Sequence, residues 1–166
     1  MSQNRSVKIQ FKAINLKKDY DICVGFRKDS YICSFGTDDG YEKSISGYHE
    51  RMTNRFQDNR WFYRHIWYEN QIIGQLEFKS FSQWEQFGYV HLMYVIPEYR
   101  GLGIANQAQE YIEKKLISCG CKGAVLSVSR INQRAVHHYK KWGWYYVEKN
   151  PKHELTDFFR REFPTS

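Results

Sequence analysis

The stretch Val95-Ile-Pro-Glu-Tyr-Arg-Gly-Leu-Gly-Ile-Ala105 constrains the fold of this chain more than any other segment. An apolar run ends at Pro97, which cannot donate to a strand ladder, and Gly101 and Gly103 then permit a tight turn with positive φ. The residues that follow have helical spacing, so the unpaired N–H groups of a helix N-terminus point back at the turn. We predict a strand, a glycine turn and a helix that together bind a phosphate or pyrophosphate.

A second motif, Asn132-x-x-Ala135-x-x-x-Tyr139-x-x-x-Gly143, follows one predicted strand later. Asn132 and Tyr139 are seven positions apart, which places them on one helix face about two turns, or roughly 10 Å, from each other. Ala135 lies between them on that face and leaves room for a ligand alongside. Taken singly, these residues are also explained as a helix cap, a core aromatic and a C-terminal glycine. Their position after the glycine turn favours a shared binding site.

Hydrophobic periodicity predicts a single α/β domain over residues 1–166, with the element order β-α-α-β-β-β-α-β-α-β-β. Two strands joined through a helix must run parallel, whereas the hairpin-like middle of the chain is antiparallel. The expected architecture is therefore a mixed, mostly antiparallel sheet flanked by helices. The expected strands are 6–14, 60–69, 72–78, 87–96, 124–128, 144–148 and 155–163, and the expected helices are 17–36, 44–58, 102–118 and 132–142.

The net charge and its distribution limit the kinds of ligand and partner that we expect. The net charge of +7 suits an anionic ligand, but Lys and Arg are scattered without a run of five, so a nucleic-acid partner is not expected. The four cysteines, Cys23, Cys33, Cys119 and Cys121, have neither zinc nor redox spacing, and we expect reduced thiols and no metal. The N-terminus lacks an apolar signal stretch and no window approaches eighteen apolar residues, which predicts a cytoplasmic protein without membrane association.

Both motifs resemble those of the GCN5-related N-acetyltransferases (GNAT superfamily). Residues 93–105 look like the acyl-CoA pyrophosphate motif of that family, and residues 132–144 look like its next motif. The motif similarity covers roughly residues 87–148, and the N-terminal third matches only in its order of elements. The resemblance implies an N-acetyltransferase that binds acetyl-CoA where two parallel central strands splay apart. It also implies direct attack of a primary amine on the thioester in a ternary complex.

The resemblance further implies a set of acetyl-CoA contacts. Main-chain groups near Met93, Tyr94 and Val95 would pair with the pantetheine arm, and one N–H there would polarise the thioester carbonyl. Arg134 or Lys140 would meet the adenosine phosphates. The complete predicted cofactor set is Met93, Tyr94, Val95, Arg100, Gly101, Leu102, Gly103, Ile104, Ala105, Asn106, Asn132 and Tyr139.

Two residues are expected to take part in catalysis. Tyr139 matches the family position that often protonates the leaving thiolate. The carboxylates that serve as bases in relatives are absent here, and Ser127 occupies one of those positions. His91 is the predicted base because an imidazole titrates near neutral pH. A buried structural histidine, or Glu77 or Glu85 acting through water, are the alternatives.

The acceptor is not determined by the sequence. We expect it to contact the two N-terminal helices and the loop around residues 81–86, a region rich in aromatic residues that also suit core packing. A small amine, an aminoglycoside-like antibiotic, an amino acid and a peptide or protein N-terminus all remain open. A non-catalytic acyl-CoA-binding module is the alternative function. A homodimer is compatible with an exposed edge of the C-terminal strands.

Overall fold

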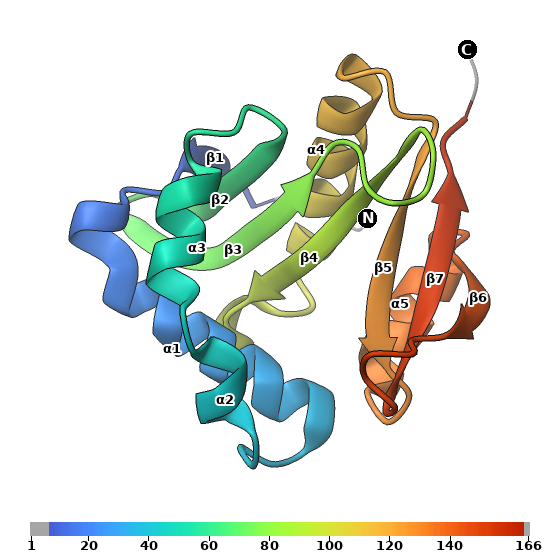
Figure 1. Ribbon diagram of the computed structural model, residues 1–166. Coiled ribbons are helices and arrows are strands. Elements are labelled where there is room, and N and C mark those ends of the chain that lie inside the picture. The colour runs from blue at the N-terminus through green and yellow to red at the C-terminus, as the bar shows by residue number, and fades with distance from the viewer. Residues whose placement is uncertain (1–6, 165–166) are drawn as a thin grey trace, which may run out of the picture.

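A computed structural model describes residues 7–164 as a seven-stranded sheet with helices on both faces (Figure 1). The strand order is β1-β2-β3-β4-β5-β7-β6. The strands are β1 (Gln10–Ala13), β2 (Trp61–Tyr68), β3 (Gln71–Lys79), β4 (Phe87–Val95), β5 (Gly123–Ser129), β6 (Tyr145–Lys149) and β7 (Thr156–Glu162). The helices are α1 (Leu16–Phe35), α2 (Tyr41–Ile45), α3 (Tyr48–Arg55), α4 (Ile104–Ser118) and α5 (Gln133–Lys141), with a 3₁₀ turn, η1 (Pro97–Tyr99), after β4.

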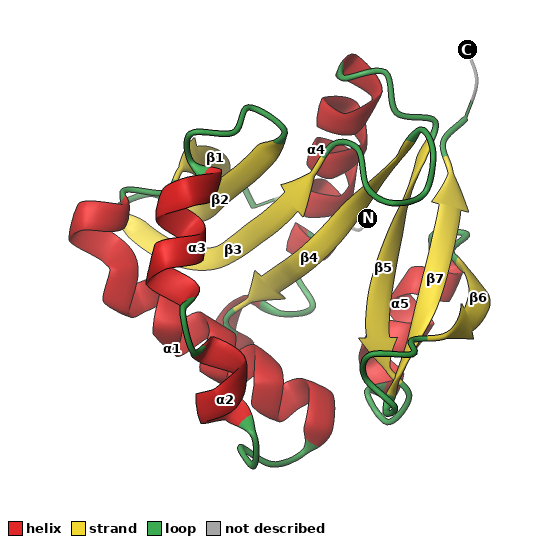
Figure 2. Ribbon diagram, viewed as in Figure 1, coloured by secondary structure: helices red, strands yellow, loops and turns green. Residues whose placement is uncertain are grey.

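The strand directions confirm the predicted fold class. Among the strands of residues 7–164, β4 and β5 form the parallel pair and every other pairing is antiparallel (Figure 2). The parallel pair is connected through α4, as a crossover between parallel neighbours requires.

The two parallel strands separate along their length. Pairing between them extends from Phe87 with Gly123 to Val90 with Leu126 and then stops. Beyond this point β5 remains paired with β7 and β4 remains paired with β3, so the facing edges of β4 and β5 diverge (Figure 1). The predicted splay of the central strands is therefore present, and it opens a gap beside the C-terminal half of β4.

A β-bulge lies on β4 at the start of this gap. Phe78 pairs with Val90 and Glu77 pairs with Leu92, so His91 is the extra residue on its strand. A bulge bends the strand and increases its local twist, which contributes to the divergence from β5.

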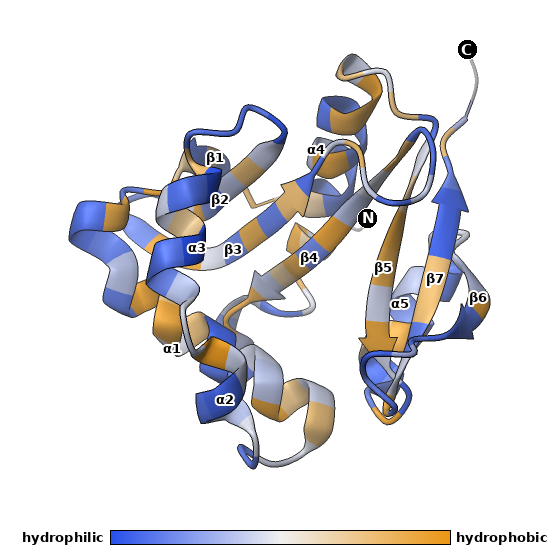
Figure 3. Cartoon of the chain, in the orientation of Figure 1, coloured by the Kyte–Doolittle hydropathy of each residue, from blue (hydrophilic) through white to orange (hydrophobic). Residues whose placement is uncertain are grey.

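The core is divided between the two faces of the sheet. On one face, α4 buries Ile104, Ala108, Ile112 and Leu116 against the central strands, where hydrophobic residues recur (Figure 3). The apolar stripe of α4 begins at Ile104, which is buried in the core, whereas the next residue, Ala105, is half-buried. A second cluster on the opposite face packs α1 and α3 onto β2 through Cys23, Tyr48, Met52 and Tyr63.

Two predicted elements differ from the structure. The helix expected over residues 44–58 is two helices, α2 and α3, because Gly47 adopts φ 75° and a left-handed residue ends one helix before the next begins. The first strand is shorter than predicted and begins at Gln10, while Ser6 lies outside the described residues. The remaining elements begin and end within two residues of the prediction.

The cysteines are free thiols, and burial raises the pKa of Cys23 to about 12. In the part of the chain that the structure describes, no three His, Cys, Asp or Glu side chains come together as metal ligands. None of the helices in residues 7–164 combines the length and the apolar composition needed to cross a membrane.

Candidate active site

Two cavities meet at the gap beside β4. The smaller, of about 470 Å³, lies against the glycine turn and the first turn of α4. The larger, of about 1110 Å³, extends between α1, α2 and the β6–β7 connection. Both are lined by Ser30, Met93, Asn132, Ala135 and Tyr139. A ligand in one cavity is therefore adjacent to a ligand in the other at these shared residues.

The glycine turn forms the floor of the smaller cavity. Gly101 and Gly103 have φ values of 80° and 81°, which glycine adopts without a steric penalty. Gly103 caps α4 without a side-chain hydrogen bond, so the first N–H groups of the helix have no capping partner. A Cβ at either glycine would meet no atom within 4 Å, so the space in front of the turn is open. Open N–H groups at a helix N-terminus fit a diphosphate.

Most of the predicted cofactor residues come together at this cavity. Leu102 and Ile104 are the exceptions, because the Leu102 side chain is 46% exposed and Ile104 packs in the core. Of the two basic residues proposed for the adenosine phosphates, Arg134 lines the cavity; Lys140 does not, and its neighbour Lys141 does. The predicted residues that line it are Met93, Tyr94, Val95, Arg100, Gly101, Gly103, Ala105, Asn106, Asn132 and Tyr139.

The main chain of β4 presents alternate residues to the gap. The Ile96 N–H donates to the Ile73 carbonyl on the β3 side at 2.8 Å. Backbone groups of successive strand residues point to opposite edges, so Met93 and Val95 face the gap. The main chain of Tyr94 faces β3, where Tyr94 pairs with Gln75. It is therefore not available to the pantetheine arm, contrary to the prediction.

Arg100 is held by the protein itself. Its Nε donates to the Val95 carbonyl at 2.8 Å, and Nη2 lies 3.3 Å from the Asp29 carboxylate. The guanidinium also lies over the ring of Tyr94, whose hydroxyl donates to Asp29. Arg100 therefore joins α1 to the end of β4 and brings a fixed positive charge to the cavity. Arg100 is predicted by its motif, whereas no sequence signal marks Asp29.

Tyr139 lies at the junction of the two cavities. It projects from α5, where the Asn132 side chain accepts a hydrogen bond from the Ala135 N–H at 3.3 Å and caps the helix. Desolvation raises the pKa of Tyr139 to about 12. The phenol therefore stays protonated throughout the physiological range and is available as a proton donor.

His91 borders the larger cavity, with Tyr89 and Trp61 at ring-centroid distances of 4.5 and 4.9 Å. Its side chain is open to the cavity rather than sealed in the core. Desolvation, followed by the positive charges of Arg55, Arg27 and Lys79, lowers the pKa of His91 to about 3. This imidazole is neutral at physiological pH but weakly basic, which differs from the near-neutral titration that the sequence analysis expected.

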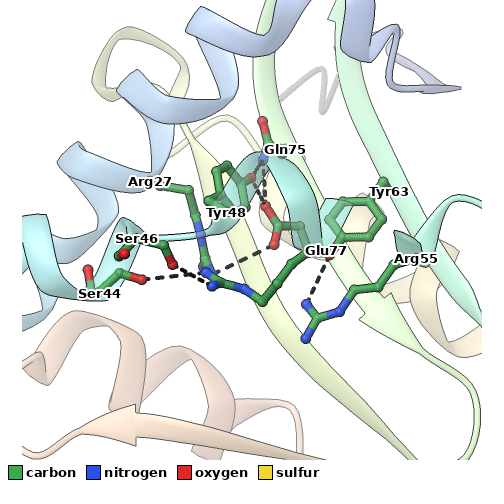
Figure 4. Close-up of polar contacts among 9 residues, drawn as sticks. Arg27, Ser44, Ser46, Tyr48, Arg55, Tyr63, Gln75 and Glu77 are labelled. Carbon is green, nitrogen blue, oxygen red and sulfur yellow. Dashed lines mark hydrogen bonds and ion pairs between the residues drawn. The ribbon is translucent and has the colours of Figure 1, made fainter. Parts of the chain in front are cut away.

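Glu77 belongs to a buried polar cluster beneath α1 and α3 (Figure 4). Its Oε2 accepts hydrogen bonds from the Tyr48 hydroxyl at 2.5 Å and from the Gln75 amide at 2.6 Å. Its Oε1 lies 3.7 Å from Nη2 of Arg27. Because Glu77 is 1% exposed and well bonded, its position suits holding Arg27 and Tyr48 in place. The alternative base Glu85 is exposed in the β3–β4 loop.

The sequence profile of the acetyltransferase (GNAT) family matches residues 23–144. The chain belongs to this family. The acetyltransferase plu1384 of Photorhabdus laumondii is 34% identical over 74 residues, which are 45% of this chain and 48% of that protein. The match thus spans about half the length of that curated relative.

Solved structures share the fold at low identity. The PaiA N-acetyltransferase of Thermoplasma acidophilum, in complex with coenzyme A, superposes with a TM-score of 0.78 at 18% identity, over 94% of this chain and 99% of that one. The spermidine N-acetyltransferase of Vibrio cholerae, in complex with coenzyme A and spermine, gives 0.66 at 16% identity, over 92% of each chain. These similarities confirm the expected architecture.

Proposed function

We propose that residues 1–166 form a single acyl-CoA N-acyltransferase domain that transfers the acetyl group of acetyl-CoA to a primary amine of a small molecule or peptide. The meeting of two cavities at Tyr139 carries this proposal, because one has an open diphosphate site and the other has room for an acceptor. Membership of the GNAT family supports acetyl transfer. The coenzyme A in the Thermoplasma structure and the coenzyme A with spermine in the Vibrio structure support a cofactor and an amine.

Acetyl-CoA, when bound, supplies the activated acetyl thioester. The main-chain N–H groups of Gly101, Gly103, Ala105 and Asn106 hold the diphosphate, and Arg134 and Lys141 add positive charge at the rim. The gap-facing main-chain groups of Met93 and Val95 hold the pantetheine arm. The Val95 carbonyl already accepts from Arg100, so the Val95 N–H is the more available group of that residue.

Positioning of the amine against the thioester is the main contribution of the protein to the rate. Tyr139 donates its phenolic proton to the departing thiolate and regains a proton from water in the adjoining cavity. The desolvation and the nearby positive charges that lower the pKa of His91 also disfavour an ammonium ion, so the acceptor binds there as a neutral amine. His91 accepts a hydrogen bond from the amine, and the amine proton leaves through water in the larger cavity.

The proposal is tested by mixing the protein with acetyl-CoA and a panel of primary amines and measuring free thiol release. We expect amine-dependent release, and also thermal stabilisation by acetyl-CoA and CoA well above their dissociation constants. Stabilisation by CoA without turnover of any amine would favour the non-catalytic binding module. Stabilisation by ATP but by neither CoA nor acetyl-CoA would contradict the cofactor.

A further inference from the structure

Among residues 7–164, no side chain or carbonyl accepts a hydrogen bond from the Arg27 guanidinium, which forms an ion pair with Glu77. Arg27 projects from α1 toward Glu77 and borders the larger cavity together with His91 (Figure 4). The ion pair with Glu77, at 3.7 Å, is longer than a hydrogen bond, and the side chain is only 29% exposed. A guanidinium has five N–H donors in a planar fork, and partly removing it from water without partners is costly. Arg27 is therefore suited to an acceptor that enters from the cavity.

Other basic side chains lie near Arg27 on the side of the larger cavity formed by α1 and α2. Lys43 borders the same cavity from α2, and Arg51 fixes the α2–α3 turn by donating to the Ser46 carbonyl at 2.6 Å. The compensating carboxylate of Glu77 is buried behind Arg27 and is already bonded to Tyr48.

Among residues 7–164, the acidic residues that border the larger cavity lie in its connecting segments. Asp39 lies between α1 and α2, and Glu154 lies between β6 and β7 beside Lys152. Arg55 and Lys79 lie over the ring of Trp61, which contacts His91. An acceptor with only amino groups meets net positive charge at this centre.

We infer that the acceptor is an amine that also carries a carboxylate, as amino acids do, and that Arg27 binds this carboxylate. The planar fork of a guanidinium matches a carboxylate with two parallel hydrogen bonds. An anion also offsets the charge of the basic side chains near Arg27, while the amine of the same molecule lies uncharged at His91. The inference rests on the proposed function and makes it specific: amino carboxylates are preferred to polyamines and to neutral amines.

The test compares amines that differ only in the anion. Each of three amino carboxylates is compared with its own amide: glycine, β-alanine and 4-aminobutyrate. Spermidine is included as a polycation without an anionic group. Phosphoethanolamine is compared with ethanolamine to test a phosphate in place of the carboxylate. Calculated for the free-amine form, kcat/KM is expected to be at least about tenfold higher for the best carboxylate than for its amide. Arg27→Gln should abolish this preference, with a much larger fall in kcat/KM for the carboxylate than for its amide. Arg27→Lys should retain part of it.

The matched control is Lys28→Gln, which removes the same charge from the next position of α1, where the side chain is exposed and borders neither cavity. Lys28→Gln should leave kcat/KM unchanged for both amines of every pair. Arg27→Lys keeps a cation facing Glu77 and therefore serves if Arg27→Gln fails to fold. The carboxylate assignment would be overturned if spermidine or the amides were the preferred substrates. It would also be overturned if the Arg27 variants lost kcat/KM equally for carboxylate and amide. A larger Arg27-dependent preference for phosphoethanolamine over ethanolamine would overturn it as well.

A binding measurement separates this inference from the proposed function. The CoA-saturated protein is titrated calorimetrically with N-acetyl-β-alanine and with N-acetyl-β-alaninamide. Binding of the carboxylate that is lost in Arg27→Gln, with no amine turned over, would support the site and contradict the transferase. Turnover of neutral amines without Arg27-dependent carboxylate binding would support the transferase and overturn the inference.

Discussion

The Nε of Arg100 donates to the carbonyl oxygen of Val95 at 2.8 Å, which ties the glycine turn to the last residue of β4. The carbonyl would otherwise face the gap between β4 and β5. Because the same guanidinium also pairs with Asp29 of α1, three separate segments meet at one side chain. The geometry of the proposed diphosphate site therefore depends on the contacts of Arg100 with Val95 and Asp29, which lie outside the N–H groups that would bind the diphosphate.

We expect Arg100→Ala to lower the free energy of unfolding by about 1–3 kcal/mol, because hydrogen bonds to a charged group are lost at a partly buried position. The affinity for CoA should fall as well, since the turn loses its anchor. Denaturant unfolding and calorimetric titration measure the two effects. Arg134→Ala, at an exposed position that borders the same cavity, should reduce CoA affinity without changing stability. Wild-type stability in Arg100→Ala would refute the anchoring role.

Gly103→Trp should abolish CoA binding while leaving the chain folded. The indole would occupy the open space in front of the turn, where a Cβ meets no atom within 4 Å. The strain of a non-glycine residue at φ 81° costs roughly 1–2 kcal/mol, less than the stability of a typical domain. Gly120→Trp is the matched control, with φ 91°, no Cβ neighbour and no place at either cavity. Equal CoA affinity in the two variants would contradict the assigned diphosphate site.

The fold was largely predictable because its signals are local. Pro97, the two turn glycines and the alternating strands each act within a few residues, and they fix the central β4-turn-α4-β5 unit. The break between α2 and α3 was missed, since one glycine within a helical pattern does not by itself predict a left-handed residue.

The cofactor side of the site was predicted better than the acceptor side for a related reason. Main-chain N–H groups at Gly103 follow from local conformation, whereas Asp29 meets Arg100 from 71 positions away in the sequence. Arg27 and Tyr48 reach Glu77 only through packing of two helices on the sheet. The pKa of His91 likewise depends on desolvation in the folded chain and on charges from α1, α3 and β3, which no sequence window contains.

Acid should destabilise the protein partly through His91. Its pKa is lowered from 6.5 to about 3, so the unfolded chain binds the proton more readily than the folded chain between these values. This contribution to stability is complete above about pH 6.5 and is lost as the pH falls toward 3. His91→Asn should therefore show a smaller decrease in melting temperature between about pH 7 and about pH 4.

The comparison with His137→Asn, an exposed position on α5, isolates the effect of the environment of His91. That variant should follow the wild-type melting curve across the pH range. Burial lowers the pKa of His65 in the same direction, so some acid sensitivity should remain in His91→Asn. Parallel pH dependence in His91→Asn and wild type would show that the imidazole titrates alike in the folded and unfolded states.

Tyr139→Phe should lower kcat by about 10²-fold while leaving the affinity for acetyl-CoA within roughly threefold of wild type, because the ring still fills its place and only the donor is lost. With a pKa of about 12, the phenol should produce no decline of the wild-type rate at moderately alkaline pH. Thiol-release kinetics and calorimetric titration measure these quantities. Tyr146→Phe removes a hydroxyl from the exposed strand β6 and should have no effect. An unchanged kcat in Tyr139→Phe would contradict the role of Tyr139 as a proton donor. Tyr139 would then be a packing residue that orders the cofactor sulfur.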